Sequence, residues 1–240
     1  MKTIICENSQ LPEKAADFIA QILQKKPDAV LAMACGETMK PVWKRLSEKV
    51  REGELRFKNA RVLCVTEFAG AAEEKSCRHA LQTGFLERVD VRADNCFFPD
   101  PDAPEDYDRL IESLGGIDLA VLGIGEDCHI GYNEPGTLFD TATHVQKLTD
   151  RTRRQLLKRG FTDQDMPQNA VTMGVKTLTD TREILVIASG GDKAGAVYQM
   201  LYAKTTPYIP AAYLQIPLEV TVLLDTEAAR ELEIGGIKNG

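Results

Sequence analysis

Residues 123–135 contain the side chains best suited to chemistry in this 240-residue chain. His129 follows Asp127 by two positions and precedes Glu134 by five. Side chains two residues apart in extended backbone project to the same side, so Asp127 would lie beside the imidazole and orient it. Glu134 would hold the other side of the ring. This spacing is typical of a histidine that moves protons in catalysis.

Two other interpretations of this loop have to be weighed. It could be a solvated loop with an incidental histidine, which is how we interpret His79 and His144. It could also bind a metal ion. No second histidine or cysteine falls at ligand spacing, and Cys128 would point away from His129. We therefore expect a catalytic histidine and no metal.

Two further loops have features of an anion site. Gly36 and Thr38 follow an apolar run and precede a predicted helix, so backbone N–H groups and a hydroxyl could hold an anion there. An ordinary turn with a capping threonine is the alternative. Lys193 stands at the start of another predicted helix, where a cation is unfavourable unless an anion lies between it and the helix.

A basic stretch and a polar strand end complete the candidates. Most charges of residues 151–159 would form a solvated helix face, although one or two could close over a phosphate. Thr66 and Glu67 end another apolar run. The chain has no G-x-G-x-x-G and no P-loop motif. We therefore predict a small phosphorylated substrate, proton-transfer chemistry and no nucleotide or other cofactor.

Short apolar runs alternating with helix-period segments would position these loops. The predicted strands are residues 3–6, 29–34, 61–65, 117–124, 170–174, 183–188 and 219–224, and the predicted helices are 12–25, 41–51, 76–87, 104–114, 151–158, 193–202 and 226–233. Several strands are continuous apolar runs, which is typical of strands covered on both faces. The pattern predicts an α/β fold, a doubly wound, mostly parallel sheet with helices on both faces in a Rossmann-like three-layer sandwich, as one domain over residues 1–240.

Composition narrows the class of protein. Apolar residues make up 43% and charged residues 27% of the chain, and the net charge is −7 without a basic block, so we expect neither a nucleic-acid nor a membrane partner. No apolar run approaches the roughly 20 residues of a membrane span. The apolar stretch within residues 1–7 is too short for that of a signal peptide. Six cysteines without a C-x-x-C pair indicate reduced, mostly buried thiols in a cytoplasmic protein.

The whole pattern resembles the glucosamine-6-phosphate deaminase/isomerase family, including its galactosamine-6-phosphate relatives. The family's loop reads glycine-x-glycine-x-Asp/Asn-glycine-His-x-x-x-Asn-Glu-Pro, and residues 123–135 keep the His…Asn-Glu-Pro spacing whole. Weaker similarity follows the chain order at residues 35–38, 65–70, 148–153, 172–174 and 189–193. The 6-phosphogluconolactonases are similar in fold and in the glycine-His loop, but lack the Asn-Glu-Pro continuation.

The resemblance implies aldose–ketose isomerisation coupled to loss of ammonia from a hexosamine 6-phosphate, by an isomerase/deaminase-type hydrolase. His129 would assist ring opening by moving the proton of the ring oxygen, while Asp127 and Glu134 orient it. The implied phosphate ligands are Cys35, Gly36, Thr38, Lys193, and Lys158 or Arg159 from a mobile segment. A homo-oligomer is possible.

Three departures from the family pattern bear on activity. In the family an aspartate takes the proton from the second sugar carbon, and Thr66 stands at its position here. Glu67 matches the next residue of the family pattern and would point to the other side of the strand. Cys128 replaces a glycine, which would strain the loop if its φ must be positive. Glu37 replaces a small residue and would repel phosphate unless turned outward.

The departures leave two alternatives open. Thr66 is no base at neutral pH, so the chain could bind a sugar phosphate without turning it over. A lactonase acting on 6-phosphogluconolactone would need only His129 as its base. Residues 142–146 lack the basic side chains with which some family members bind an activating N-acetylated sugar phosphate, so we predict no such activation.

Overall fold

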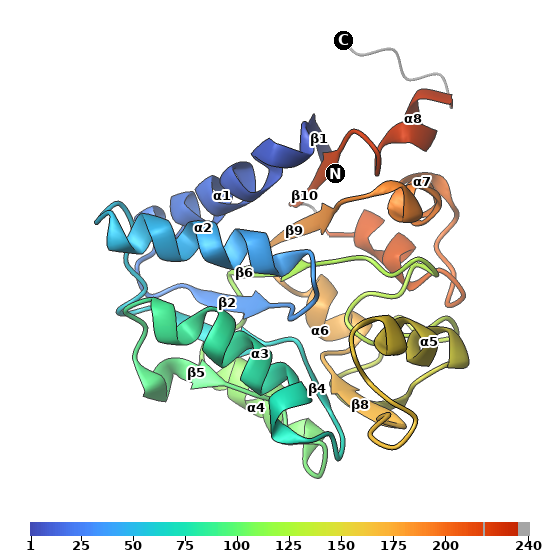
Figure 1. Cartoon of the computed structure of the whole chain (residues 1–240), viewed down its shortest axis with the longest axis horizontal. Helices are drawn as coiled ribbons and strands as arrows, with labels where there is room; N and C mark the ends of the chain where they lie inside the picture. Colours follow the sequence, from blue (N-terminus) through green and yellow to red (C-terminus); the bar gives the residue numbers. More distant parts are fainter. Residues whose placement is uncertain (218, 235–240) are drawn as a thin grey trace.

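A seven-stranded, wholly parallel sheet lies at the centre of the molecule (Figure 1). The structure is a computed structural model that describes residues 1–217 and 219–234. The predicted domain of residues 1–240 therefore includes residue 218 and residues 235–240, which lie outside the described residues.

The strands are β1 (Lys2–Cys6), β2 (Val30–Met33), β3 (Arg61–Cys64), β4 (Thr66–Phe68), β5 (Cys96–Phe97), β6 (Leu119–Leu122), β7 (His144–Lys147), β8 (Asn169–Thr172), β9 (Glu183–Ala188) and β10 (Val220–Asp225). The helices are α1 (Leu11–Lys25), α2 (Met39–Arg51), α3 (Cys77–Gly84), α4 (Pro104–Ser113), α5 (Asp150–Lys158), α6 (Val175–Thr179), α7 (Ala194–Tyr202) and α8 (Arg230–Ile234).

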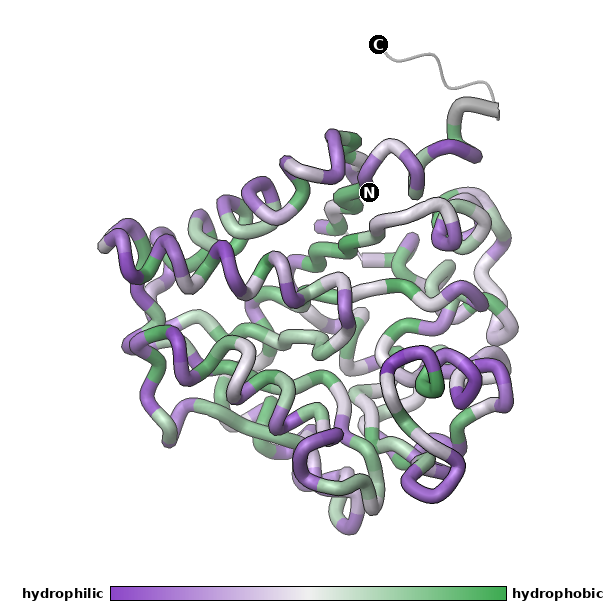
Figure 2. The backbone as a smooth tube through the Cα atoms, viewed as in Figure 1, coloured by the Kyte–Doolittle hydropathy of each residue, from purple (hydrophilic) through white to green (hydrophobic). Residues whose placement is uncertain are grey.

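The large sheet has the order β1-β10-β9-β6-β2-β3-β5. Successive side chains of its strands point alternately into the two core layers on either face of the sheet. In β2, Leu31 and Met33 belong to one buried cluster, and Val30 and Ala32 belong to the other. Strands covered on both faces need no polar face, which explains their continuous apolar sequences. Hydrophobic residues accordingly concentrate in the central strands and hydrophilic ones on the outer helices (Figure 2).

Helices cover both faces of this sheet. Apolar side chains of α1, α2 and α3 join the cluster that contains Leu31, while those of α4, α6, α7 and α8 join the cluster that contains Val30. The predicted doubly wound α/β fold is confirmed. None of the helices in the described part of the chain is both long and apolar enough to cross a membrane.

A second, antiparallel sheet of three strands has the order β4-β8-β7. The predicted strand at residues 170–174 belongs here, as β8, and not to the parallel sheet. β4, β5, β7 and α6 were not predicted from sequence. β4 and β5 are only three and two residues long, and β7 is polar and partly exposed, so none has an apolar run.

Two predicted helices have different bounds in the structure. The helix predicted at 76–87 ends at Gly84 and is followed by a short 3-10 turn, Leu86–Arg88. The helix predicted at 226–233 begins only at Arg230, because Ala228 donates its backbone N–H to the Asp225 carboxylate at 2.8 Å in a preceding turn.

The carboxyl ends of four adjacent strands, β9, β6, β2 and β3, bring the candidate loops together. From β2 the chain continues toward β3 and β5, whereas from β6 it continues toward β9 and β10, so the strand order reverses between β2 and β6. Parallel sheets bind ligands in the crevice at such a reversal. In Figure 1 the arrow of β2 points toward α5, which supplies the remaining wall.

Candidate active site

A pocket of about 410 Å³ lies at this reversal. Its wall combines the loops after β2, β6 and β9, the junction between β3 and β4, and the end of α5. These segments are up to about 160 residues apart in the chain, so only the fold brings them together. The volume falls in the range of small-molecule sites.

His129 lines the pocket and is bonded to Asp127. Its Nδ1 lies 2.7 Å from Asp127 Oδ1, and the two side chains are 12% and 9% exposed. Burial disfavours the charged carboxylate, but the hydrogen bond from His129 outweighs it and lowers the pKa of Asp127 to about 2. An ionised Asp127 places the imidazole proton on Nδ1, which leaves Nε2 as the proton acceptor.

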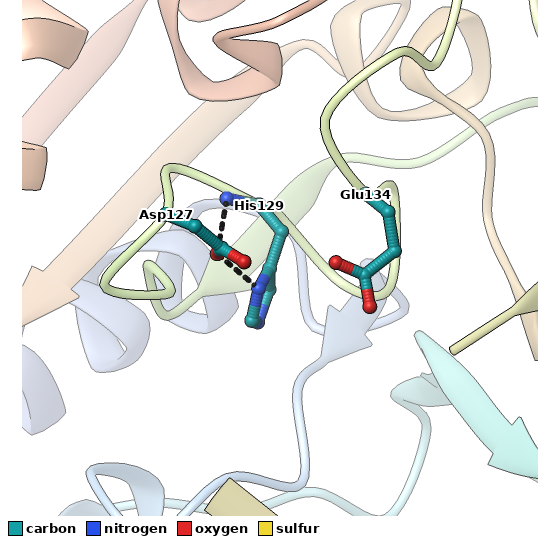
Figure 3. A group of neighbouring side chains, drawn as sticks. All are labelled: Asp127, His129 and Glu134. Carbon is teal, nitrogen blue, oxygen red and sulfur yellow. Dashed lines mark hydrogen bonds and ion pairs between the residues drawn. The ribbon is translucent and has the colours of Figure 1, made fainter. Parts of the chain in front are cut away.

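Glu134 lies on the other side of the imidazole from Asp127 (Figure 3). It is 2% exposed and accepts hydrogen bonds at 3.3 Å from the backbone N–H and the hydroxyl of Thr149. The pair therefore flanks the ring as the sequence spacing suggested, although neither carboxylate lines the pocket. Asp127 alone bonds to the ring among the residues that the structure describes, and contact with a ligand is left to His129.

The two glycines after β6 and one strained residue shape this loop. A Cβ at Gly125 would overlap the imidazole ring, so only glycine allows His129 its position. Cys128 has φ +67°, the left-handed conformation that a glycine adopts more easily. The strain expected from the glycine replacement is therefore present. The Cys128 thiol points away from the pocket toward the carbonyl of Ala196, at 3.8 Å.

The same three side chains also satisfy the distances of a metal site. One ligand atom each from Asp127, His129 and Glu134 lie within 4.8 Å of one another. The absence of a resident metal stays a prediction. The hydrogen bond between Nδ1 and Asp127 uses the ring atom that would face such an ion.

The lining of the pocket also carries cationic side chains, which we call the basic wall. Gly36, Thr38 and Lys193 line the pocket from the loops after β2 and β9, as do Lys158 and Arg159 from the end of α5. A Cβ at Gly36 would meet nothing within 4 Å, so that backbone is open to a ligand. These five predicted phosphate ligands thus line one cavity.

Arg159 extends across the pocket to the β2 loop. Its Nη2 donates to the carbonyl oxygen of Cys35 at 3.4 Å, and its Nε lies 3.8 Å from Glu37. Glu37 is 57% exposed and is also paired with Lys40 at 2.8 Å. The carboxylate that departs from the family pattern is therefore turned outward and partly neutralised.

Asp225 is a supporting residue that the sequence analysis missed. Its carboxylate accepts hydrogen bonds from the Ser189 hydroxyl at 2.6 Å and from the backbone N–H of Gly190 at 3.0 and 3.1 Å. These bonds fix the turn, with φ +92° at Gly190, that carries Lys193. The only sequence signal was an acidic residue at the end of a predicted strand.

Thr66 and Glu67 are on opposite sides of the junction between the two sheets. Thr66 is buried in the pocket floor. Glu67 does not line the pocket: its carboxylate accepts the backbone N–H groups of Cys77 and Arg78, both at 2.8 Å, and so caps α3. Glu67 is therefore not placed to act on a molecule in the pocket, because a neighbouring strand position faces the other way.

Three thiols surround Thr66, and sequence reasoning did not anticipate this cluster. The Thr66 hydroxyl lies 3.6 Å from Cys35 Sγ and 3.5 Å from Cys77 Sγ, and the Cys64 thiol donates to the Thr66 carbonyl at 3.1 Å. All six cysteines are free and five are buried, as predicted; Cys96 is the partly exposed one. The cysteines are too far apart in sequence for spacing to indicate a cluster.

The chain matches one family model along most of its length. The model is that of glucosamine-6-phosphate isomerases/6-phosphogluconolactonase, over residues 8–222. The chain is 40% identical to a glucosamine-6-phosphate deaminase of Bacillus velezensis, covering 95% of this chain and 99% of that protein. It is 36% identical to one of Colwellia psychrerythraea, covering 97% and 91%.

Solved structures have the same fold. A monomeric glucosamine-6-phosphate deaminase superposes with a TM-score of 0.92 and 35% identity, covering 96% of this chain and 99% of that one. A 6-phosphogluconolactonase of Trypanosoma brucei superposes with a TM-score of 0.78, but at 20% identity, covering 96% and 98%. The second likeness concerns the fold alone.

Proposed function

The chain belongs to the family of glucosamine-6-phosphate isomerases and 6-phosphogluconolactonases, and from that premise we propose that it converts a hexosamine 6-phosphate to a ketose 6-phosphate and ammonia. The observation that carries this proposal is that His129, which is bonded to Asp127, lines the same pocket as the basic wall. Glucosamine 6-phosphate is the first substrate to test, because the relatives are named for it.

The basic wall would hold the phosphate. Lys193 supplies a cation at the end of a turn whose first backbone N–H, that of Gly190, Asp225 fixes. Gly36 and Thr38 offer a backbone and a hydroxyl. Lys158 and Arg159 would close over the anion from α5. Bound there, the phosphate would place the sugar ring between these groups and His129.

His129 would open the sugar ring. Nε2 takes the proton of the anomeric hydroxyl and returns it to the ring oxygen, which gives the open-chain aldehyde. The buried, ionised Asp127 stabilises the imidazolium formed in between, and Glu134 adds a second negative charge nearby. These roles would make the chain an isomerase coupled to a deamination. A water molecule is consumed only when the product imine is hydrolysed.

The test is to incubate the protein with glucosamine 6-phosphate, galactosamine 6-phosphate and 6-phosphogluconolactone, and to assay ammonia, ketose phosphate and lactone hydrolysis. We expect ammonia and fructose 6-phosphate in equal amounts from the gluco substrate. Thermal stabilisation by either amino sugar phosphate without turnover would instead support a binding protein, and lactone hydrolysis alone would support a lactonase.

The remaining properties follow from this proposal. We propose a cytoplasmic enzyme of one domain, since only Val65 separates β3 of the large sheet from β4 of the small sheet, and Thr66 of β4 lines the pocket. We propose no resident cofactor. Adding N-acetylglucosamine 6-phosphate should leave the saturation curve hyperbolic; a sigmoidal curve that the acetylated sugar straightens would contradict this.

A further inference from the structure

The proposed reaction needs a base that the sequence departure removes. Isomerisation transfers a proton from the second carbon of the sugar, which bears the nitrogen, to the first. The group that carries this proton must contact the sugar inside the pocket. Thr66 is buried at the floor, but a threonine hydroxyl does not ionise at neutral pH.

Acidic residues that line the pocket lie at its rim and are paired with cations. Glu37 lies 2.8 Å from Lys40, and Asp192 is exposed and lies 3.6 Å from Lys193. Glu126 is 3.7 Å from an Arg151 nitrogen. Each of them is held by a surface cation, so none is placed at the floor as a base.

Two other ionisable groups of the lining are also unsuitable. His129 is used at the ring oxygen and is bound to Asp127. Burial raises the pKa of the Tyr132 hydroxyl well above its usual value, so it stays protonated. Among the described groups of the lining, this leaves the thiol of Cys35.

Cys35 occupies the required place. It follows β2, lines the pocket, and is only 6% exposed. Its Sγ lies 3.6 Å from the Thr66 hydroxyl, so the thiol and the residue that replaces the family's aspartate share one spot on the floor. Cys64 and Cys77 lie behind them and do not line the pocket.

The surroundings of Cys35 favour its thiolate. The neighbouring thiols of Cys64 and then Cys77, with smaller contributions from Thr66 and Arg159, lower the pKa of Cys35 well below its usual value, although burial opposes this. The pKa values of Cys64 and Cys77 rise instead, through the hydrogen bond with Cys35, burial and the nearby Glu67. Of these three thiols, only the one that faces the pocket has a lowered pKa.

We propose that Cys35, as a thiolate, is the base that transfers the proton from the second to the first carbon of the sugar phosphate. The proposal rests on the proposed function. In the open-chain substrate the C2–H bond breaks and an S–H bond forms at Cys35. The C–H electron pair forms the C1=C2 double bond, the carbonyl π pair moves to O1, and O1 takes a proton from water.

The same thiol then completes the isomerisation. Cys35 returns its proton to C1, the nitrogen lone pair forms a C2=N bond, and the thiolate is regenerated. Water adds to C2 and ammonia leaves, which gives the ketone. The Thr66 hydroxyl, 3.6 Å from Cys35 Sγ, would be a positioning residue that donates a hydrogen bond to the thiolate. Cys77, 3.5 Å from the same hydroxyl, would hold it in place.

The direct test compares Cys35→Ser and Cys35→Ala with Cys96→Ser, whose sulfur is remote from the pocket and bonds to the Arg92 carbonyl at 3.4 Å. Loss of a positioned base should lower kcat about 10²–10⁴-fold in both Cys35 variants, with KM changed little. Cys96→Ser should retain the wild-type rate. Thermal unfolding of each variant reports whether the fold is kept.

A second measurement keeps the test independent of folding. Iodoacetamide should alkylate Cys35 of the wild type faster at pH 6.5 than Cys96, as mapped by mass spectrometry, and fructose 6-phosphate should protect it. Thr66→Asp added to Cys35→Ser should recover part of the lost kcat. Cys35 variants within about threefold of wild type, or a Cys35 that reacts more slowly than Cys96, would overturn the inference.

The two proposals fail in different ways. A wild type that releases no ammonia from either hexosamine 6-phosphate overturns the proposed function, and the inference with it. A wild type that does release ammonia, beside equally active Cys35 variants, overturns the inference alone.

Discussion

The two walls of the pocket are built in different ways. The His129 wall is a single loop whose imidazole, two carboxylates and glycines lie within 13 consecutive residues, and it keeps the family's spacing. The floor around Thr66 combines Cys35 after β2, Cys64 at the end of β3 and Cys77 at the start of α3. One wall is therefore local in the sequence, whereas the fold assembles the floor from thiols that lie far apart in the chain.

The largest expected effect on the rate comes from disabling the His129 wall. His129→Gln should lower kcat about 10²–10⁴-fold, because the amide cannot move the proton of the ring oxygen. Binding of fructose 6-phosphate, measured by calorimetry, should persist through the basic wall. His144→Gln is the matched control, since His144 lies on β7 and does not line this pocket, and its ring nitrogens bond to Ala142 O and Gln146 Oε1. Equal rates for both variants would break the comparison.

A backbone change should show that the loop works as a unit. Gly125→Ala would place a methyl group against the imidazole and displace it from Asp127. We expect kcat to fall by about 10²-fold, since a misplaced general acid–base group loses most of its effect. In Gly195→Ala the new methyl group would lie 3.7 Å from Glu231, an ordinary contact. That control should retain activity, and a fully active Gly125→Ala would show that the imidazole position is not critical.

The basic wall should affect binding more than chemistry. Lys193→Ala should raise KM about 10–100-fold with little change in kcat, which corresponds to the loss of one charge-assisted hydrogen bond of about 1.5–3 kcal/mol. Lys176→Ala, an exposed lysine paired with Asp180, is the control. A Lys193 variant with unchanged KM and reduced kcat would place the phosphate elsewhere.

The smallest effect concerns stability and pH. The pKa of Asp127 is lowered to about 2 in the folded state, so its ionised form adds stability above its unfolded pKa of about 4, and this contribution is lost as the pH falls toward 2. With solvent screening allowed for, we expect about 1–2 kcal/mol. Urea unfolding of wild type and Asp127→Asn should show a difference at pH 6 that shrinks by pH 3. A constant difference would mean that the carboxylate is not stabilised by its charge.

The same comparison explains what could be predicted from sequence. The contact between Asp127 and His129 could be expected because the two residues are near neighbours in the sequence. The local geometry differs from the expected one, since residues 126–128 form a turn with Cys128 at φ +67° and not extended backbone. Continuous apolar runs likewise predicted the parallel sheet. β4 was not predicted because it is only three residues long. The junction at Val65, which turns Thr66 inward and Glu67 toward α3, was therefore not predicted either.

The thiol cluster could not be predicted for a different reason. Positions 35, 64 and 77 come together only because β2 and β3 are neighbours and α3 packs beside β4. No periodicity in the sequence encodes that contact. Asp225 is a similar case, since it reaches Gly190 only through the pairing of β10 with β9.

The most direct test of the account is one NMR experiment on the wild-type protein with glucosamine 6-phosphate in D2O. We expect fructose 6-phosphate that carries deuterium at C1, together with ammonium, because a base on the pocket floor passes an exchangeable proton between the two carbons. Substrate that stays chemically unchanged while it raises the melting temperature would contradict it.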